Sequence, residues 1–237
     1  MNVFCSMVGV KSMSVINHLR TTYARGENLP GKKQFVAQVI RLERLLGPTA
    51  FNEELEIVSA DGQTLGYQAP RWFVHLTGLR HLISRVVLFG DEMVLLQRRG
   101  GDRFGVSGTY DLTAGGHVLA GENPLEAAYR EMTEEIGIDR SALIGETLHQ
   151  IGKPHPVYSA KPLDLTINNE VTILYGGRLA NGKNIMFNID QTEAGRLFFQ
   201  SLEKTQAYID QQLAASSLIC SLPIFLSHRD RFLANYR

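Results

Sequence analysis

Cysteine is scarce in this 237-residue chain. The two cysteines, Cys5 and Cys220, lie far apart and in no metal-binding or redox spacing. This pattern argues against a disulfide framework and is typical of a reducing compartment. We therefore expect two free thiols and a cytoplasmic protein.

The chain also lacks net charge and long apolar runs. Its 24 basic residues balance 24 acidic ones, so no overall field would draw it to nucleic acid or to an anionic membrane surface. The longest apolar runs, such as Val86 to Phe89 and Leu218 to Phe225, are too short to cross a bilayer. The start has no basic residues before its apolar stretch, which disfavours a secretory signal. We expect a small-molecule partner, and neither nucleic acid nor a membrane.

The N-terminal region has the pattern of two helices. Residues 13 to about 46 carry apolar side chains at helical spacing on both sides of the turn signal Leu29-Pro30-Gly31. We interpret residues 1–50 as a helical N-terminal extension and residues 51–237 as the main domain. The extension would cap a pocket, form a homodimer interface or do neither, and its sequence does not decide among these.

The main domain mixes strands and helices without regular alternation. Asp61-Gly62 between two short strand-like runs is a strong hairpin signal. The glycine-rich stretch 98–117 predicts loop and short strand. Further strands are expected at 86–89, 93–97, about 142–151 and 170–178, and helices at about 123–136, 191–214 and 223–235.

Residues 116–138 read GHVLAGENPLEAAYREMTEEIGI and contain a well-specified helix. Asn123 is a good N-cap, Pro124 stands at the first helical position, and Glu126 falls where it can complete a capping box. Gly137 stands where a left-handed C-terminal residue is wanted.

The two faces of this helix differ sharply. At 100° per residue, the apolar face that would pack on the sheet comprises Leu125, Ala128, Tyr129, Met132 and Ile136. The other face comprises Glu126, Arg130, Glu131, Glu134 and Glu135. Neighbouring like charges cost roughly 0.2–0.5 kcal/mol per pair, and a divalent cation bound by these carboxylates would reverse that effect. The alternative is an ordinary solvated helix face.

The whole stretch resembles the box of the Nudix family at every defining position: Gly116, Glu122, Arg130-Glu131, Glu134-Glu135 and Gly137. The resemblance implies an α/β fold, a Nudix-type α/β/α sandwich with a mixed β-sheet, here with the helical extension added. It implies that Mg²⁺ or Mn²⁺ is bound by the metal ligands Glu131, Glu134 and Glu135, with the Gly116 carbonyl as a further ligand. Arg130, together with Glu122, would orient this cluster.

Hydrolysis of a phosphate anhydride is the activity that this resemblance implies. The substrate would be a nucleoside diphosphate linked to another group, or a related organic diphosphate. Metal ions bridging phosphates neutralise developing charge and activate water, and a glutamate not fully engaged by metal can act as general base. Glu134 is the first candidate for this base and Glu170 the second.

Over roughly residues 53–180 the chain is similar to Nudix proteins related to type I isopentenyl diphosphate isomerases. His81, His117 and Glu170 match positions of their second metal site, and His75 is one residue off the expected spacing. Gly115, however, stands where those isomerases place a catalytic cysteine, and the glutamate box is intact. Hydrolysis is therefore favoured over a prenyl diphosphate isomerase activity. A non-catalytic nucleotide or sugar-phosphate sensor remains the third hypothesis.

Three arginines border the glycine-rich stretch: Arg98, Arg99 and Arg103. Guanidinium groups form paired hydrogen bonds with phosphates, so these residues are candidates for binding the diphosphate of the substrate. The alternative is solvated surface charge.

Overall fold

The computed structural model describes residues 10–23, 29–46, 53–90, 93–100, 108–161, 166–180, 185–190 and 194–236. The chain divides into two compact units. The first comprises Met1–Leu82, Val118–Gly121 and Pro156–Val171, and the second comprises Ile83–His117, Glu122–His155 and Thr172–Arg237.

The first unit contains the N-terminal helices and a hairpin. Its elements up to residue 77 are α1 (Val10–Tyr23), α2 (Lys32–Leu46), β1 (Glu54–Val58), β2 (Thr64–Pro70) and α3 (Arg71–Thr77). The two helices and the antiparallel hairpin across Asp61-Gly62 confirm the sequence-based predictions. The rings of Tyr23, Phe35 and Phe73 pack together from α1, α2 and α3, with centroids 5.7–6.3 Å apart. The N-terminal helices therefore share one apolar core with α3.

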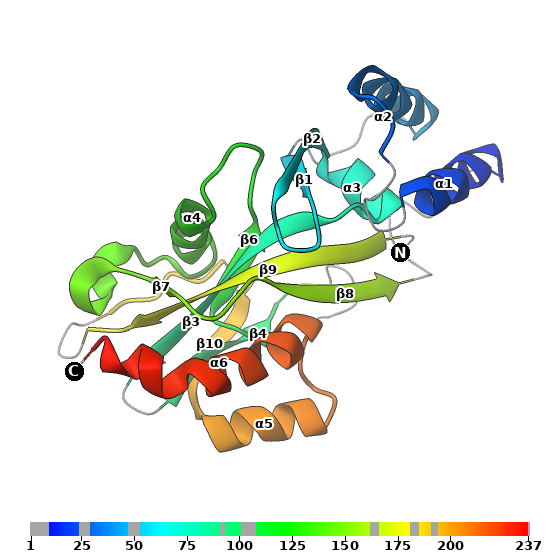
Figure 1. Ribbon diagram of the computed structural model, residues 1–237. Coiled ribbons are helices and arrows are strands. Elements are labelled where there is room, and N and C mark those ends of the chain that lie inside the picture. Colours follow the sequence, from blue (N-terminus) through cyan, green and yellow to red (C-terminus); the bar gives the residue numbers. More distant parts are fainter. Residues whose placement is uncertain are drawn as a thin grey trace. The chain divides into compact units, whose positions relative to one another are not determined.

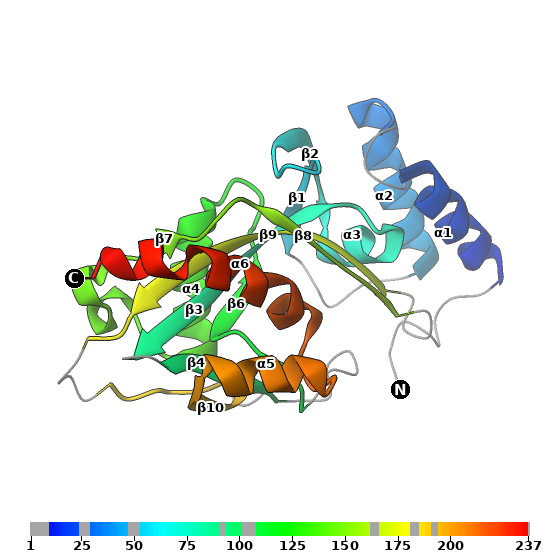
Figure 2. The ribbon, with the colours of Figure 1, turned by 60° about the horizontal axis from the view of Figure 1, so that its bottom comes forward.

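The second unit is built around a mixed sheet. The strands of the chain beyond the hairpin are β3 (His81–Gly90), β4 (Met93–Arg99), β5 (Tyr110–Asp111), β6 (Ala114–His117), β7 (His149–Gln150), β8 (His155–Lys161), β9 (Thr166–Arg178) and β10 (Ala194–Ser201). In the second unit β10, β4 and β3 are consecutive neighbours, β5 pairs with β4, and β6 and β9 pair with β3. The pairs β3–β4 and β4–β10 are antiparallel, whereas the arrows of β3 and β9 point the same way in Figures 1 and 2.

Helices cover both faces of this sheet. One face of β3 and β4 presents Val86, Leu88 and Leu95 to α4 (Pro124–Ile136). The alternate residues Val87, Phe89 and Val94 pack with the apolar residues of α6 (Ser216–Ala234). Successive strand residues point to opposite faces, so the second unit is an α/β/α sandwich with α4 and α6 on opposite sides (Figure 1).

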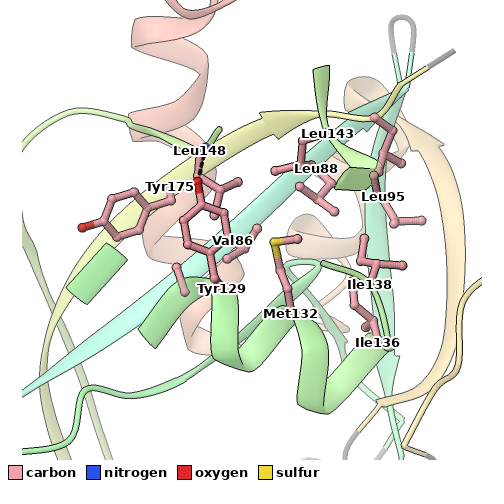
Figure 3. Packing of buried hydrophobic residues seen from close by; sticks show 14 residues of the cluster. Val86, Leu88, Leu95, Tyr129, Met132, Ile136, Ile138, Leu143, Leu148 and Tyr175 are labelled. Atoms are coloured by element: carbon pink, nitrogen blue, oxygen red, sulfur yellow. Dashed lines mark hydrogen bonds between the residues drawn. The ribbon is translucent and has the colours of Figure 1, made fainter. Parts of the chain in front are cut away.

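The apolar face predicted for α4 is confirmed. Tyr129, Met132 and Ile136 are buried and point from the helix toward the sheet (Figure 3). The Tyr129 hydroxyl accepts a hydrogen bond from the Leu148 backbone N–H at 2.9 Å. This contact satisfies the polar end of an otherwise apolar surface.

The strand predicted at about 142–151 forms only at His149–Gln150. Two short 3₁₀ turns, η3 (Arg140–Ala142) and η4 (Ile144–Glu146), precede the two-residue strand β7. The Asp139 side chain accepts from the Ser141 N–H, and Gly145 has a left-handed φ of 68°. Local turn chemistry of this kind competes with extended structure.

The helix predicted at about 191–214 is wrong over its first half. β10 occupies residues 194–201 and pairs with β4 from Arg99 to Met93. The helix α5 (Leu202–Asp210) begins only afterwards, where the Ser201 hydroxyl accepts from the Lys204 N–H. Backbone hydrogen bonds to the edge of β4 stabilise these residues as a strand more than their local helix propensity stabilises a helix.

The last helix starts earlier than the predicted residue 223. α6 begins at Ser216, and Pro223 lies inside it. None of the helices in the described part of the chain combines the length and the apolarity needed to cross a membrane.

Candidate functional site

The helix α4 begins and ends where its sequence predicts. The Asn123 side chain accepts a hydrogen bond from the backbone N–H two residues on, and Gly137 caps the C-terminus with φ 70°. Glu126, in contrast to the predicted capping box, accepts two hydrogen bonds from Arg140 at 2.6 and 2.7 Å. These caps set the register of the charged residues between them.

Arg130 joins three glutamates of the box at one point. Its guanidinium donates two bonds to Glu122 at 2.9 and 3.0 Å, one to Glu131 at 2.6 Å and one to Glu134 at 3.0 Å. A fifth bond reaches the His117 carbonyl at 2.8 Å. The hydrogen bond to Glu122 is the largest cause that raises the pKa of Arg130, followed by the charge of Glu131.

Two of the box carboxylates are buried. Glu131 is 7% exposed and Glu135 is 6% exposed, whereas 58% of the Glu134 side chain is exposed. Burying a carboxylate is costly unless it is paired or coordinates a metal. A solvated helix face therefore does not describe Glu131 and Glu135.

Two strands of the sheet donate hydrogen bonds to Glu135. Its Oε2 accepts a hydrogen bond from the side-chain amide of Gln97 at 3.2 Å and one from the Gly115 backbone N–H at 3.3 Å. Gln97 lies on β4, and Gly115 lies on β6. Two strands thus fix the orientation of a carboxylate that α4 provides.

The two glycines of β6 are close-packed for different reasons. A Cβ at Gly115 would lie 2.7 Å from the Ser84 carbonyl oxygen and 2.7 Å from Cδ of Arg85. A Cβ at Gly116 would overlap the carboxylate of Glu131. The backbone of β6 therefore leaves no room for a side chain at position 115. At position 116 it lies in direct contact with the Glu131 carboxylate.

The carboxylates on this face of α4 are of the type that a hard divalent cation binds. Glu131, Glu134 and Glu135 project at three- and four-residue spacing from one helix, and Glu131 lies directly against Gly116. Carboxylate and carbonyl oxygens are the ligands that Mg²⁺ and similar ions take in proteins. The cradle formed by Gly116 and the burial of two of the carboxylates agree with such an occupant.

Asp111 binds two arginines, Arg99 at the end of β4 and Arg85 on β3. It is fully buried, and its Oδ2 lies 2.9 Å from Arg99 and 3.7 Å from Arg85. The Ser217 hydroxyl and the Leu112 N–H both donate to Oδ1. Burial by itself would raise the pKa of Asp111, but the two arginines and these donors hold it below the usual value.

Of the three arginines proposed for the diphosphate, two are described. Arg99 is held by Asp111 and its side chain is 28% exposed. Arg98 donates through Nε to the Gly108 carbonyl at 3.2 Å. Arg103 lies outside the described residues.

Gln97 and Asp111 are not among the residues that the sequence motifs predict for the site. They are direct partners in the antiparallel β4–β5 pairing, and both are buried. The only hint in the sequence was a glutamine that follows the apolar run Val94-Leu95-Leu96. Which face it occupies is decided by strand pairing, which local sequence does not reveal.

The remaining candidates are distributed over both units. Glu170 on β9 and His81 on β3 are both buried in the first unit. The ring centroid of His81 lies 4.9 Å from that of His75 on α3. Burial lowers the pKa of His75 well below its ordinary value and that of His81 to about 4. Both histidines are therefore neutral at neutral pH. His117 belongs to β6 of the second unit.

Comparison with known proteins matches the part of the chain that contains α4 and its glutamates. A model described as the NUDIX domain matches residues 79–210, more than half of the chain. Nudix hydrolase 3 of Arabidopsis thaliana is 33% identical over 88 residues, which cover 36% of this chain and 11% of that protein. The uncharacterized Nudix hydrolase YfcD of Escherichia coli K12 is 38% identical over 90 residues, which cover 38% of this chain and 49% of that protein.

A solved structure shares the fold. DR0079 from Deinococcus radiodurans superimposes with a TM-score of 0.51 at 19% identity, covering 69% of this chain and 92% of that one. The matched segment spans about half of YfcD and about a tenth of the Arabidopsis protein.

Proposed function

Because the chain belongs to the Nudix family, we propose that it hydrolyses a phosphate anhydride bond with Mg²⁺ or Mn²⁺ as cofactor. The substrate is a nucleoside diphosphate linked to another group, or a related organic diphosphate. The observation that carries this proposal is the convergence of Glu122, Glu131 and Glu134 on the guanidinium of Arg130 at 2.6–3.0 Å.

The metal would be held by Glu131, Glu134 and Glu135, with the carbonyl of Gly116 as a further ligand. When bound, such an ion neutralises charge on the phosphates and makes water a better nucleophile at neutral pH. Glu131 and Glu135 are buried and oriented by hydrogen bonds, so little reorganisation is needed when the ion arrives.

Two glutamates are candidates for the general base that takes the proton of the attacking water. Glu134 is the first, because it is the most exposed of the three metal-binding candidates and accepts a 3.0 Å bond from Arg130. Glu170 is the second, on its motif position alone. Arg130 would keep the carboxylates in place and balance part of their charge.

The arginines would bind the diphosphate of the substrate. Arg99 has its guanidinium anchored by Asp111 and remains partly exposed, which leaves donors for phosphate oxygens. Arg98 and Arg103 would act beside it. Guanidinium groups suit this task because their planar donors match phosphate oxygens in pairs.

The geometry counts against isomerase chemistry. A cysteine at position 115 would place its Cβ 2.7 Å from the Ser84 carbonyl oxygen, so this backbone has no room for the thiol. A sensor that binds a nucleotide or sugar phosphate without turnover uses the same fold and is separated from the hydrolase only by assay.

The test is release of phosphate or nucleoside monophosphate across nucleotides, nucleotide sugars, dinucleotides, coenzymes and prenyl diphosphates, with Mg²⁺ and with Mn²⁺. Glu134→Gln removes the proposed base and ligand. Glu126→Gln is the matched control, because Glu126 lies on the same helix but pairs with Arg140.

We expect metal-dependent turnover of one substrate class, lost in Glu134→Gln and retained in Glu126→Gln. Loss of a general base alone typically lowers the rate about 10²- to 10⁴-fold. Tight binding without turnover by the wild type would establish the sensor. Equal activity of the two variants would remove Glu134 from the mechanism.

A further inference from the structure

Gln97 is a buried polar residue with one atom that the fold leaves unsatisfied. It is 1% exposed and follows the apolar run of β4. Its side-chain nitrogen donates to Oε2 of Glu135 at 3.2 Å. Its side-chain oxygen, Oε1, is buried and has no hydrogen-bond partner among the described residues.

The alternation of side chains along β4 explains why Gln97 reaches α4. Leu95, two residues earlier, packs in the apolar cluster beneath α4, and residues two apart on a strand share a face. Gln97 therefore projects from the sheet toward the same helix. It meets Glu135 one turn after Glu131.

An unsatisfied amide oxygen in the interior needs an explanation. Such atoms are rare in folded proteins, and they are found where a water or an ion completes the arrangement or where function requires them. A methionine would fill similar volume with no polar atom to bury. The amide is therefore needed less to fill the core than to donate to the buried carboxylate of Glu135.

We propose that Gln97 is a positioning residue for the metal site. This inference rests on the metal-dependent function proposed above. Its amide N–H, together with the Gly115 N–H, holds Oε2 of Glu135, a carboxylate that would be one of the ligands of the ion. The buried Gln97 oxygen, which has no partner among the described residues, would accept a hydrogen bond from water at this site. Residues that orient a metal ligand in this way are typical partners of metal sites.

The test measures Mn²⁺ binding by calorimetry and by electron paramagnetic resonance, without substrate. Gln97→Met removes both polar atoms. Thr113→Val is the control, because Thr113, between β5 and β6, is also fully buried and its hydroxyl bonds the backbone of Leu95 and Leu88 rather than Glu135. Thermal unfolding of each variant is measured in parallel.

We expect Gln97→Met to raise the Mn²⁺ dissociation constant about 10- to 100-fold and to lower the melting temperature no more than Thr113→Val does, because each variant removes hydrogen bonds from buried groups. Thr113→Val should melt earlier and bind Mn²⁺ as the wild type does. The double variant Gln97→Met with Glu135→Gln should lose less Mn²⁺ affinity than the sum of the two single losses, because Gln97 acts in part through Glu135.

Three results would overturn the inference. Wild-type affinity in Gln97→Met would show that the amide does not serve the metal, and the proposed function would stand. An equal loss in Thr113→Val would assign the effect to general destabilisation of the sheet. Absence of Mn²⁺ binding by the wild type would refute the metal-dependent function, and the role of Gln97 with it.

Discussion

An alanine at position 116 is expected to impair activity while sparing the fold. A Cβ at Gly116 would lie 2.5 Å from Oε2 of Glu131 and closer still to its Oε1. Ordinary contact begins at 3.4 Å, so the carboxylate must move by about 1 Å to admit the methyl group. Glu131 is a proposed metal ligand and is bonded to Arg130 at 2.6 Å, and both arrangements would be disturbed.

The magnitude follows from that displacement. A misplacement of about 1 Å in a catalytic group costs about 100-fold in rate, which corresponds to about 2.7 kcal/mol of transition-state stabilisation. The free energy of unfolding should change by less than about 1 kcal/mol, because Gly116 is not among the glycines with positive φ. The displaced atoms also belong to a side chain rather than to the backbone.

The assay is kcat/KM on the substrate identified by the panel, together with Mn²⁺ affinity and urea unfolding. Gly31→Ala is the control, because a Cβ there has nothing within 4 Å. A kcat/KM within about threefold of the wild type would refute the reasoning from the Glu131 contact. A large loss of stability would show that the backbone, rather than the carboxylate, gives way.

Three further outcomes are expected. Gly115→Ala should lower the free energy of unfolding by about 1–3 kcal/mol, because its Cβ meets the Ser84 carbonyl; thermal unfolding that matches the wild type would contradict this. Asp111→Asn should destabilise the fold by about 3 kcal/mol at pH 7. Because the folded-state pKa of Asp111 is lowered, its contribution is present above its ordinary pKa and fades as pH falls through the folded value, so urea unfolding should show a smaller difference at pH 3 than at pH 7. Tyr129→Phe should cost about 1–3 kcal/mol by leaving the Leu148 N–H without its acceptor, and an unchanged urea midpoint would disprove it.

The box helix could be predicted from its own residues. Asn123, Pro124 and Gly137 specify its ends, and the apolar spacing specifies the face that packs on the sheet. These signals act within a few residues of the chain, where side chains compete directly for backbone groups. The same holds for the N-terminal helices and the hairpin across Asp61-Gly62.

Strand β10 could not be predicted in this way. Its residues have a pattern that favours a helix, yet they pair with β4 over its whole length. Pairing partners lie about a hundred residues away in the chain, and an available sheet edge outweighs local propensity.

Tertiary packing likewise decides which side chains of the site are buried and what they contact. The local sequence placed Glu131, Glu134 and Glu135 on one helix face, but only the packing of α4 on the sheet buried two of them and left Glu134 exposed. The contact of Glu131 with Gly116 and the support of Glu135 by Gln97 join α4 to strands β6 and β4. Such contacts depend on strand register and helix position together, and neither is encoded in any short stretch of the chain.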